Sequence, residues 1–414
     1  MEPKIRFKGF EGEWKETIWG NHIVSTHTGT NLLGEVSNKG IPLLKMGNIQ
    51  RGFFDLDKME YLAANQNPPV NCIANYGDFF YNTRNTLELV GKGATWMKKD
   101  GIYAFNSNIA ICKLDGIDTF FFNYLYNTLH SIKQVQARAK GTTSVAAVYM
   151  RDLKSIELTL PHISEQQAIA SYFTSLDSQI SASTSRLTSL KQMKAASLQA
   201  MFPQEGETVP KIRFKGFEGE WKKVVIGNIG STYSGLSGKG KEDFGIGEAK
   251  YITFLNVLTY AQIDTSILEN VDIKESEHQN EVKKGDLFFN TSSETPEEVG
   301  MCSVLDEEVD NVYLNSFCFG FRITNSCVYP KYIAYLMRSK VGRRIMSILA
   351  QGATRFNLSK KYLCKAEIPI PTSLAEQQAI ASYFTSLDRQ IFLQSQRLEK
   401  LKQIKSACLD KMFV

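Results

Sequence analysis

One glycine-rich stretch has the spacing of a phosphate-binding loop. GLSGKGKE at 235–242 matches GxxxxGK, in which backbone N–H groups cradle phosphates and a following Ser or Thr hydroxyl holds magnesium. Glu242 stands where that hydroxyl is needed, and its carboxylate would face the phosphates. We therefore expect a flexible loop here and no nucleotide site.

Two further stretches carry residue types that are used in catalysis. NPPV at 67–70 is similar to the Asn-Pro-Pro-aromatic motif that holds a target amine and stacks on a flipped base, but Val70 replaces the aromatic residue. The acidic residues around EVK at 281–283 have no Pro-Asp partner of the kind found in nuclease metal sites. The five histidines are isolated, and no Ser/His/Asp or Cys/His arrangement is present. The sequence therefore predicts no catalytic residue, no metal site and no cofactor bound by this chain.

Polar residues after strand-like runs are typical of base reading. Asn bonds adenine bidentately and Arg bonds guanine through the major groove. Each half of the chain carries such residues at matched positions: Asn48, Asn82, Thr83 and Arg84, then Asn256, Asn290, Thr291 and Ser292. Two later loops add Lys140, Thr142 and Thr143 in the first half and Arg355 and Asn357 in the second, as contacts to bases or phosphates. A turn or capping role is the competing interpretation for each residue taken alone.

Cations are concentrated at the same place in both halves. No acidic residue lies between Asp310 and Glu367, nor between Asp118 and Asp152. Clustered Lys and Arg without acids favour binding of a polyanion, although a solvated basic helix is the alternative for one copy alone. The recurrence favours a DNA-binding face, with six further candidate contacts: Lys45, Lys133, Arg138, Arg338, Arg343 and Arg344.

The halves are an internal repeat, which explains the matched positions. PKIRFKGFEGEW at 3–14 returns unchanged at 210–221, and EQQAIASYFTSLD at 165–177 returns at 376–388. The offset changes only from 207 to 211 residues between the two pairs, so both halves should share one fold. Between the identical segments the halves differ almost completely, apart from landmarks such as Gly77-Asp78 and Gly285-Asp286.

Each half ends in a long amphipathic segment. Apolar residues recur at intervals of three and four from Ile169 to Met201 and from Ile380 to Met412, which predicts helices at 164–201 and 371–414. Ser164 is the expected N-cap of the first, and a helix of this length spans about 55 Å. An apolar stripe of this length must pack on a second helix. Lys and Arg become more frequent toward the C-terminal end of both segments, and parallel packing would place these like charges together. We therefore expect antiparallel pairing within the chain, with dimerisation of whole chains as the alternative.

The remaining segments indicate an α+β fold. Strands are predicted within 41–54, 77–82, 108–114 and 155–160, and within 249–258, 285–290, 317–323 and 366–371 in the second half. One helix near 119–139, or 330–350, precedes each late loop. We therefore expect two similar domains at 1–160 and 210–370 and two long helices at 161–209 and 371–414, packed as an antiparallel coiled coil with pseudo-twofold symmetry.

The whole chain resembles a specificity subunit of a type I restriction–modification system. The resemblance rests on KIRFKGFEGEW, on the Gly-Asp strand of each half, and on a GTTS or GATR loop followed by a proline-ended strand and EQQAIASYF. The first half departs from the second by one extra residue after its loop.

The resemblance implies a non-catalytic subunit whose domains each read one half of an asymmetric bipartite site in double-stranded DNA. The helices would set the spacer and dock two methyltransferase subunits, through residues such as Phe173, Leu176, Phe384 and Leu387. Those partners would bring S-adenosylmethionine, and restriction subunits would bring ATP and Mg²⁺. The repeated segments would be identical because each presents the same surface to an identical methyltransferase. A stand-alone adenine methyltransferase or nuclease, and a scaffold that does not touch DNA, are the alternatives.

Composition fits this class of protein. The chain has 414 residues, 43% of them hydrophobic, and a net charge of +5. Seven scattered cysteines without a CxxC pair indicate a reducing compartment. The charged N-terminal stretch is unlike a secretory signal, and no apolar run is long enough to cross a membrane. We therefore expect a cytoplasmic protein.

Overall fold

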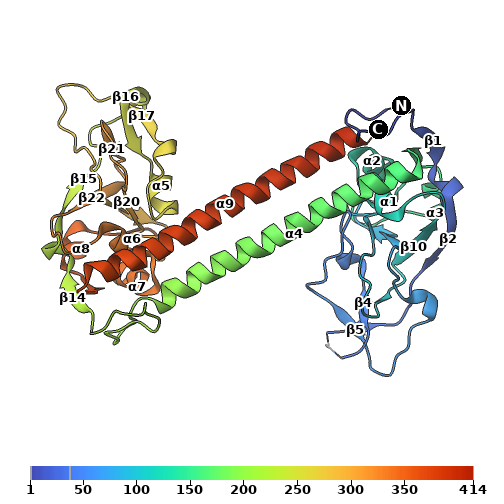
Figure 1. Ribbon diagram of the computed structural model, residues 1–414, viewed down its shortest axis with the longest axis horizontal. Coiled ribbons are helices and arrows are strands. Elements are labelled where there is room, and N and C mark those ends of the chain that lie inside the picture. Colours follow the sequence, from blue (N-terminus) through green and yellow to red (C-terminus); the bar gives the residue numbers. More distant parts are fainter. Residues whose placement is uncertain (1, 37–38, 414) are drawn as a thin grey trace. The chain divides into compact units, whose positions relative to one another are not determined.

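Two compact units make up the chain. The structure is a computed structural model that describes residues 2–36 and 39–413 (Figure 1). Unit 1 comprises Met1–Thr184 and Gln396–Val414, and unit 2 comprises Ser185–Ser395. Each unit holds one α+β domain and a segment of each long helix, so the predicted fold class is confirmed. The division falls within the two long helices, and each helix contributes to both units.

A four-stranded antiparallel sheet forms the centre of the domain in unit 1. Its order is β2-β10-β6-β8, with β2 at Ile23–Thr28, β10 at Ile109–Leu114, β6 at Phe79–Asn82 and β8 at Gly93–Thr95. Successive side chains of a strand point to opposite faces, and β6 therefore supplies two cores. Phe79 and Tyr81 pack with Trp19 on one face, while Phe80 packs with Trp96 on the other.

Smaller elements complete this domain. One sheet has the order β3-β5-β4-β9 (Gly34–Glu35, Glu60–Leu62, Pro42–Leu44, Ala104–Phe105), and another has the order β11-β12-β7 (Lys140–Gly141, Ala146–Ala147, Arg84–Asn85). The helices are α1 at Thr119–Tyr126, α2 at Leu129–Ala137 and α3 at Met150–Leu153.

Unit 2 repeats this plan. Its central sheet has the order β15-β22-β18-β20 (Gly230–Ser234, Cys318–Ile323, Leu287–Asn290, Cys302–Val304). Two others are β17-β16-β21 (Glu269–Val271, Phe244–Ile252, Val312–Leu314) and β19-β23 (Ser292–Ser293, Phe356–Asn357). Its helices are α5 at Phe254–Thr259, α6 at Pro330–Arg338, α7 at Lys340–Leu349 and α8 at Lys360–Lys365.

A short strand pair in each unit joins the repeated segments. β1 (Lys15–Ile18) follows the first tag and pairs antiparallel with β13 (Glu157–Leu160), which leads into a long helix. β14 (Lys222–Val225) and β24 (Glu367–Ile370) do the same in unit 2. The pairing places each PKIRFKGFEGEW tag beside the start of the helix that closes its own domain.

The tag and the helix are locked by a buried ion pair. Arg6 donates two hydrogen bonds of 2.8 Å to Glu165, and Arg213 donates two of 2.7 and 2.8 Å to Glu376. The carboxylates are only 2% exposed. The hydrogen bond to Glu165 raises the pKa of Arg6, as the bond to Glu376 does for Arg213. The two identical segments are therefore complementary to each other within each unit.

The glutamine after this glutamate is also part of the fold. Gln166 donates to the carbonyl of Pro161 and accepts from the backbone N–H of Asp118, at 3.0 and 2.9 Å. Gln377 makes the matching bonds to Pro371 and Tyr329. A proline separated from EQQ by three or four residues thus ties the last strand, the long helix and the start of α1 or α6 together in each unit.

The long helices are α4 (Ile163–Ala200) and α9 (Leu374–Met412), and their segments lie antiparallel in each unit (Figure 1). In unit 1 the Tyr172 hydroxyl lies 3.4 Å from Cys408 Sγ, and Lys405 pairs with Asp177 at 2.5 Å. In unit 2 Tyr383 meets Ser197 at 2.9 Å, and Lys194 pairs with Asp388. The residue numbers run in opposite directions, and the same register recurs in both units, as the pseudo-twofold prediction required.

Three local predictions were wrong. The first long helix begins at Ile163, so Ser164 lies inside it, and the backbone N–H groups of Glu165 and Gln166 bond the carbonyl of His162. The segment 254–258, predicted as part of a strand, belongs to helix α5 (Phe254–Thr259), because Thr253 caps this helix by accepting from the N–H of Asn256. Each predicted single helix before the late loop is two, because Thr128 and Ser339 cap a second helix.

Within the described residues, no helix is long and apolar enough to cross a membrane.

Candidate nucleic-acid interface

The chain makes a polar turn, here called the corner, after the inner strand β6 of unit 1 and after β18 of unit 2. Thr83 leaves β6 with its N–H and hydroxyl both donating to the carbonyl of Asn108, at 3.1 and 2.9 Å. Thr291 leaves β18 and bonds the carbonyl of Phe317 in the same way, at 3.0 and 2.8 Å. The two predicted threonines therefore fix a turn, and the next residue, Arg84 or Ser292, enters a small separate sheet.

The late loop pairs with that small sheet. In unit 1 the hairpin of β11 and β12 lies beside β7, with Ala147 opposite Arg84. In unit 2 β23 pairs with β19, with Asn357 opposite Ser292. Val148 and Leu358 then bond the carbonyls of Thr83 and Thr291 at 2.9 and 2.8 Å. The GTTS and GATR loops are thus equivalent, and the extra residue of the first loop is absorbed in its turn.

The glycine of each loop is required by its backbone. Gly141 and Gly352 have φ values of 131° and 129°, a region that L side chains rarely adopt. A Cβ at Gly141 would lie 2.3 Å from the carbonyl oxygen of Val145, and one at Gly352 would lie 2.0 Å from that of Arg355. Thr142 and Thr143 are consequently held at an exposed hairpin tip.

Two of the predicted base-reading asparagines instead brace loops. Asn48 is buried; its amide donates to the carbonyls of Asp55 and Lys58 at 3.0 Å and accepts from the N–H of Lys45 at 2.8 Å. Asn256 is fully buried and exchanges bonds of 2.9 and 3.0 Å with the backbone of Asp264. Because these amides are already bonded and out of solvent, the prediction that they contact bases is corrected.

The other two asparagines are buried as well. Asn82 donates to the carbonyl of Met46 at 3.1 Å, and Asn290 donates to the carbonyl of Glu298 and accepts from the N–H of Met301. Both side chains are 0% exposed. The prediction that these two amides contact bases is therefore wrong: Asn290 closes the turn that follows its strand, and Asn82 holds the segment around Met46.

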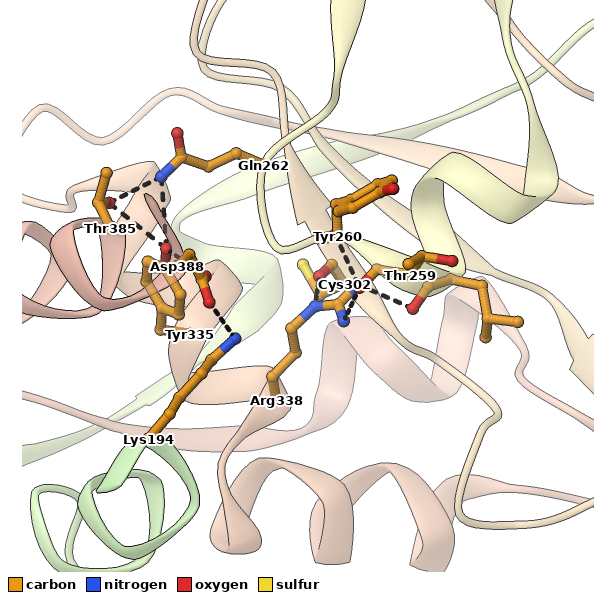
Figure 2. A network of polar contacts seen from close by, with 10 residues as sticks. Lys194, Thr259, Tyr260, Gln262, Cys302, Tyr335, Arg338, Thr385 and Asp388 are labelled. Atoms are coloured by element: carbon orange, nitrogen blue, oxygen red, sulfur yellow. Dashed lines mark hydrogen bonds and ion pairs between the residues drawn. The ribbon is translucent and has the colours of Figure 1, made fainter. Parts of the chain in front are cut away.

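Arg338 is the cap of a helix and no part of a DNA-binding face. Its guanidinium donates to the carbonyls of Val257 and Leu258 in the last turn of α5, at 2.7 and 3.2 Å. It also donates to the carbonyls of Tyr260 and Cys302, at 2.7 and 2.6 Å (Figure 2). A cation is favourable at the negative end of a helix dipole. Burial lowers the pKa of this guanidinium.

Two more predicted phosphate contacts are internal. Arg343 donates to the carbonyls of Glu297, Val299 and Gly300, and burial lowers its pKa to about 10. Arg138 donates to the carbonyl and hydroxyl of Ser155 at 2.8 Å. These arginines stabilise loops. They need no acidic partner within 119–151 or 311–366, because backbone carbonyls accept their hydrogen bonds.

The remaining predicted residues lie on the surface or at its edge. Lys45 pairs with Glu60, Lys140 with Asp152 at 3.1 Å, and Arg344 with Glu205 at 2.5 Å. Arg84, Lys133 and Arg355 are exposed, and their side chains have no hydrogen bond or ion pair with any residue that the structure describes. Asn357 is exposed beside Arg355, whose carbonyl it bonds at 3.3 Å. Arg84 and Arg355 are thus available to an external anion, each at the corner of its own unit.

Sequence reasoning missed two exposed aromatic residues at this corner. Tyr149 is 45% exposed and lies beside Arg151, with the guanidinium 5.3 Å from the ring centre. Phe317 is 61% exposed and directly follows Asn315-Ser316, a landmark of unit 2 that matches Asn106-Ser107 of unit 1. An aromatic residue directly after a landmark, in a segment where the two halves differ, is the signal that would have found Phe317.

The predicted subunit-docking residues are in the core. Phe173 and Leu176 belong to unit 1, where Phe173 packs against Phe413 with ring centres 5.9 Å apart, and Phe384 packs against Phe202 at 5.8 Å in unit 2. Leu387 is 4% exposed. These side chains cannot contact a partner, and this prediction is corrected. The exposed residues of the repeated helix segment lie four residues apart: Gln167, Ser171 and Ser175 on α4, and Gln378, Ser382 and Ser386 on α9.

Comparison with known proteins decides the family. The model of the type I restriction modification DNA specificity domain matches residues 33–192 and again residues 219–403. Together the matches cover most of the chain, one to each repeat. The chain belongs to this family. It is a specificity subunit, the non-catalytic component of a type I restriction–modification system.

Individual relatives are distant but match over nearly the whole length. The type I restriction enzyme EcoKI specificity subunit of Escherichia coli strain K12 is 22% identical over 393 residues, which is 90% of this chain and 82% of that protein. The S subunit of the type I system from M. genitalium has a TM-score of 0.63 at 16% identity, over 100% of this chain and 99% of that one. A chain in a structure concerned with complex assembly and conformational transition of the type I system has a TM-score of 0.50 at 15% identity, over 98% and 99%. These structural matches establish the shared fold.

Proposed function

We propose that each unit of this specificity subunit binds duplex DNA and reads one half of an asymmetric bipartite site. One observation supports the proposal. The same backbone arrangement, a turn at Thr83 or Thr291 with the late loop paired beside it, occurs in both units and carries different exposed residues. Unit 1 exposes Arg84 and the tip Thr142-Thr143, while unit 2 exposes Arg355 and Asn357 beside the half-buried Ser292. An Arg or Asn side chain discriminates bases in the major groove, so unequal sets read unequal sequences.

The identical segments serve a different purpose in this proposal. Gln167, Ser171 and Ser175 are exposed on α4, and the same three residue types are exposed on α9. Buried members of the repeat are explained by the fold, but exposed ones are not. We infer that two copies of one partner, the methyltransferase subunit, dock at these faces and bring S-adenosylmethionine, and that restriction subunits bring ATP and Mg²⁺. The complex then acts in the cytoplasm, which fits the seven free cysteines.

The experiment that tests the proposal exchanges one reading domain. Residues 222–370 are replaced by the corresponding segment of another member of the family, which leaves both tags and both EQQ helices unchanged. Methylated adenines are then mapped in the genome of a host that expresses the complex. We expect one half-site to change and the other to persist. Loss of both half-sites together, with an intact complex, would contradict modular reading.

A matched control separates docking from reading. Ser171→Arg and Ser382→Arg place a bulky cation on the proposed docking face of α4 or α9 without touching either corner. We expect each variant to lower the number of bound methyltransferase subunits from two to one, as counted by native mass spectrometry. An unchanged count would place the docking face elsewhere.

A further inference from the structure

Unit 1 contains an open hollow at its proposed DNA-binding corner. The hollow encloses about 490 Å³ between one face of the sheet formed by β2, β10 and β6 and the segment that follows β12. Ala110 and Tyr81 form its floor, and Arg84 and Tyr149 belong to its lining and to the surface. It therefore opens next to the two exposed planar side chains of this corner.

The corresponding space in unit 2 is filled. Ala110 pairs with Tyr81 and Thr28 in the sheet of unit 1, and Phe319 pairs with Phe289 and Ser234 at the same register in unit 2. The Phe319 ring stacks on Phe289 at 5.5 Å and 17°. Lys360 covers that ring, with Nζ 5.9 Å from its centre, and bonds the hydroxyl of Ser234 at 2.7 Å. One alanine in place of a phenylalanine thus leaves the space in unit 1 open.

The lining of the hollow combines planar side chains, such as Tyr149 and Arg84, with polar groups that have no side-chain hydrogen bond within the described residues. The hydroxyls of Thr28 and Ser107 and the amide of Asn108 have no side-chain hydrogen bond to any residue that the structure describes. Convergent donors and acceptors beside apolar and aromatic side chains are typical of sites for small planar groups. Nucleobases that have left the stack are held in this way, by aromatic or guanidinium planes and by hydrogen bonds to the base edge.

We propose that the hollow of unit 1 receives one unstacked base of the half-site that unit 1 reads, whereas unit 2 holds its half-site fully stacked. Tyr149 and Arg84 would stack on or flank the base, and Thr28, Ser107 and Asn108 would bond its edge. This inference rests on the proposed reading of DNA by unit 1. It adds a second means of discrimination, because a base is recognised after it leaves the duplex as well as in the groove.

The test uses the complex of this chain with its methyltransferase subunits and duplexes that carry the mapped site. 2-Aminopurine, which fluoresces when it is unstacked, replaces each base of the unit 1 half-site in turn, the methylated adenine excepted. We expect a fluorescence increase at one position when the complex binds. Ala110→Phe, which copies the residue of unit 2, should abolish the increase and weaken binding of the full site about tenfold, in line with the loss of one base stacking interaction.

Matched variants keep the result interpretable. Ala110→Ser leaves the hollow open and should preserve the increase, and Tyr149→Ala should reduce it without filling the core. Bipartite binding with no bright position, or with a bright position that Ala110→Phe leaves unchanged, would overturn the inference while the proposed function stands. Failure of the wild-type complex to bind any bipartite DNA would overturn the proposed function itself. Binding of free deoxynucleoside monophosphate that Ala110→Phe blocks, with no bright position in DNA, would assign the hollow to a free nucleotide and refute the proposal.

Discussion

Arginine side chains in this protein fall into two groups according to what the guanidinium bonds. Arg338 and Arg343 donate to several backbone carbonyls and are largely buried, whereas Arg84 on β7 and Arg355 in the late loop of unit 2 are exposed. A charged donor left without partners on the surface costs nothing to solvate, but it is free to neutralise a phosphate. The two groups should therefore respond to substitution in opposite ways.

Replacing an exposed arginine should affect DNA and not folding. We expect Arg84→Ala and Arg355→Ala each to weaken binding of the site and to reduce the slope of log affinity against log salt by about 1, since one phosphate contact is lost. Titrations of labelled DNA at several salt concentrations measure both quantities. Lys99→Ala, an exposed cation outside the corner, is the control. An unchanged salt slope for both arginine variants would remove them from the interface.

Replacing the buried helix cap should affect folding and not DNA. Lysine at position 338 keeps the charge but cannot direct a planar fork at several carbonyls of α5 and its neighbours. We expect Arg338→Lys to destabilise unit 2 by about 1–3 kcal/mol, the cost of unsatisfied buried polar groups, with an unchanged salt slope in DNA binding. Urea unfolding followed by circular dichroism measures the loss. Full stability together with weaker DNA binding would restore Arg338 to the surface role that sequence reasoning gave it.

At the scale of elements, the repeated segments are explained largely by their contacts with each other. Arg213 holds Glu376, Gln377 holds the end of β24 and the start of α6, and the same bonds recur in unit 1. A carboxylate that is 2% exposed requires its arginine, and so the tag and the EQQ helix must be kept together in each half. This complementarity gives a second reason for the identity of the repeats, besides an identical partner.

Breaking one such lock should weaken its own unit. Arg213→Ala leaves the buried carboxylate of Glu376 without its cation, and we expect a loss of about 3 kcal/mol in the free energy of unfolding of unit 2. Lys215→Ala, an exposed position of the same tag, should change stability by less than about 0.5 kcal/mol. Unfolding curves of the two variants and the parent make the comparison. Equal stability of Arg213→Ala and Lys215→Ala would show that the tag is dispensable for folding.

Sequence patterns predicted these elements unequally. The long helices and the Gly-Asp strands follow from strict apolar spacing, and their antiparallel pairing follows from the charges at their ends. The site was less accessible, because a polar residue after a strand has the same appearance whether it braces a turn or faces solvent. Asn82 and Arg84 are two residues apart, yet Asn82 is fully buried and Arg84 is exposed. The difference depends on the pairing of β7 with β12, which the local sequence does not show. Similarly, nothing near Arg338 in sequence shows that α5 ends against it.

At the scale of the whole molecule, the junction between the end of a long helix and a tag is built twice, once in each unit. In unit 2 α4 ends at Ala200, Phe202 follows it, and PQEGETV at 203–209 connects Phe202 to Pro210, the first residue of the second tag. In unit 1 Phe413 contacts Trp14 as Phe202 contacts Trp221, at 6.5 and 6.4 Å. Ile5 bonds the carbonyl of Lys411 as Ile212 bonds that of Ala200, both at 3.0 Å. The same junction thus exists twice, once with a covalent link.

It follows that the break in the chain can be moved from unit 1 to unit 2. A permuted chain would run from Pro210 to Phe413, continue through PQEGETV into Pro3, and end at Phe202. We expect it to fold with a free energy of unfolding within about 1 kcal/mol of the parent, because closing one seven-residue loop and opening another nearly cancel in entropy. Its complex should methylate the same bipartite site, since neither reading corner contains residues of the junction.

The control is a chain reopened inside a long helix. A break between 181 and 182 interrupts the backbone hydrogen bonds of α4 and should lower stability by several kcal/mol or prevent assembly, while using the same new link. Unfolding curves and methylation maps of the two permuted chains decide the matter. If the two junctions are equivalent, the chain ends can lie at either of them without loss of site specificity. Loss of specificity in the chain reopened at 203–209, as complete as in the chain reopened at 181, would therefore show that the junctions are not equivalent.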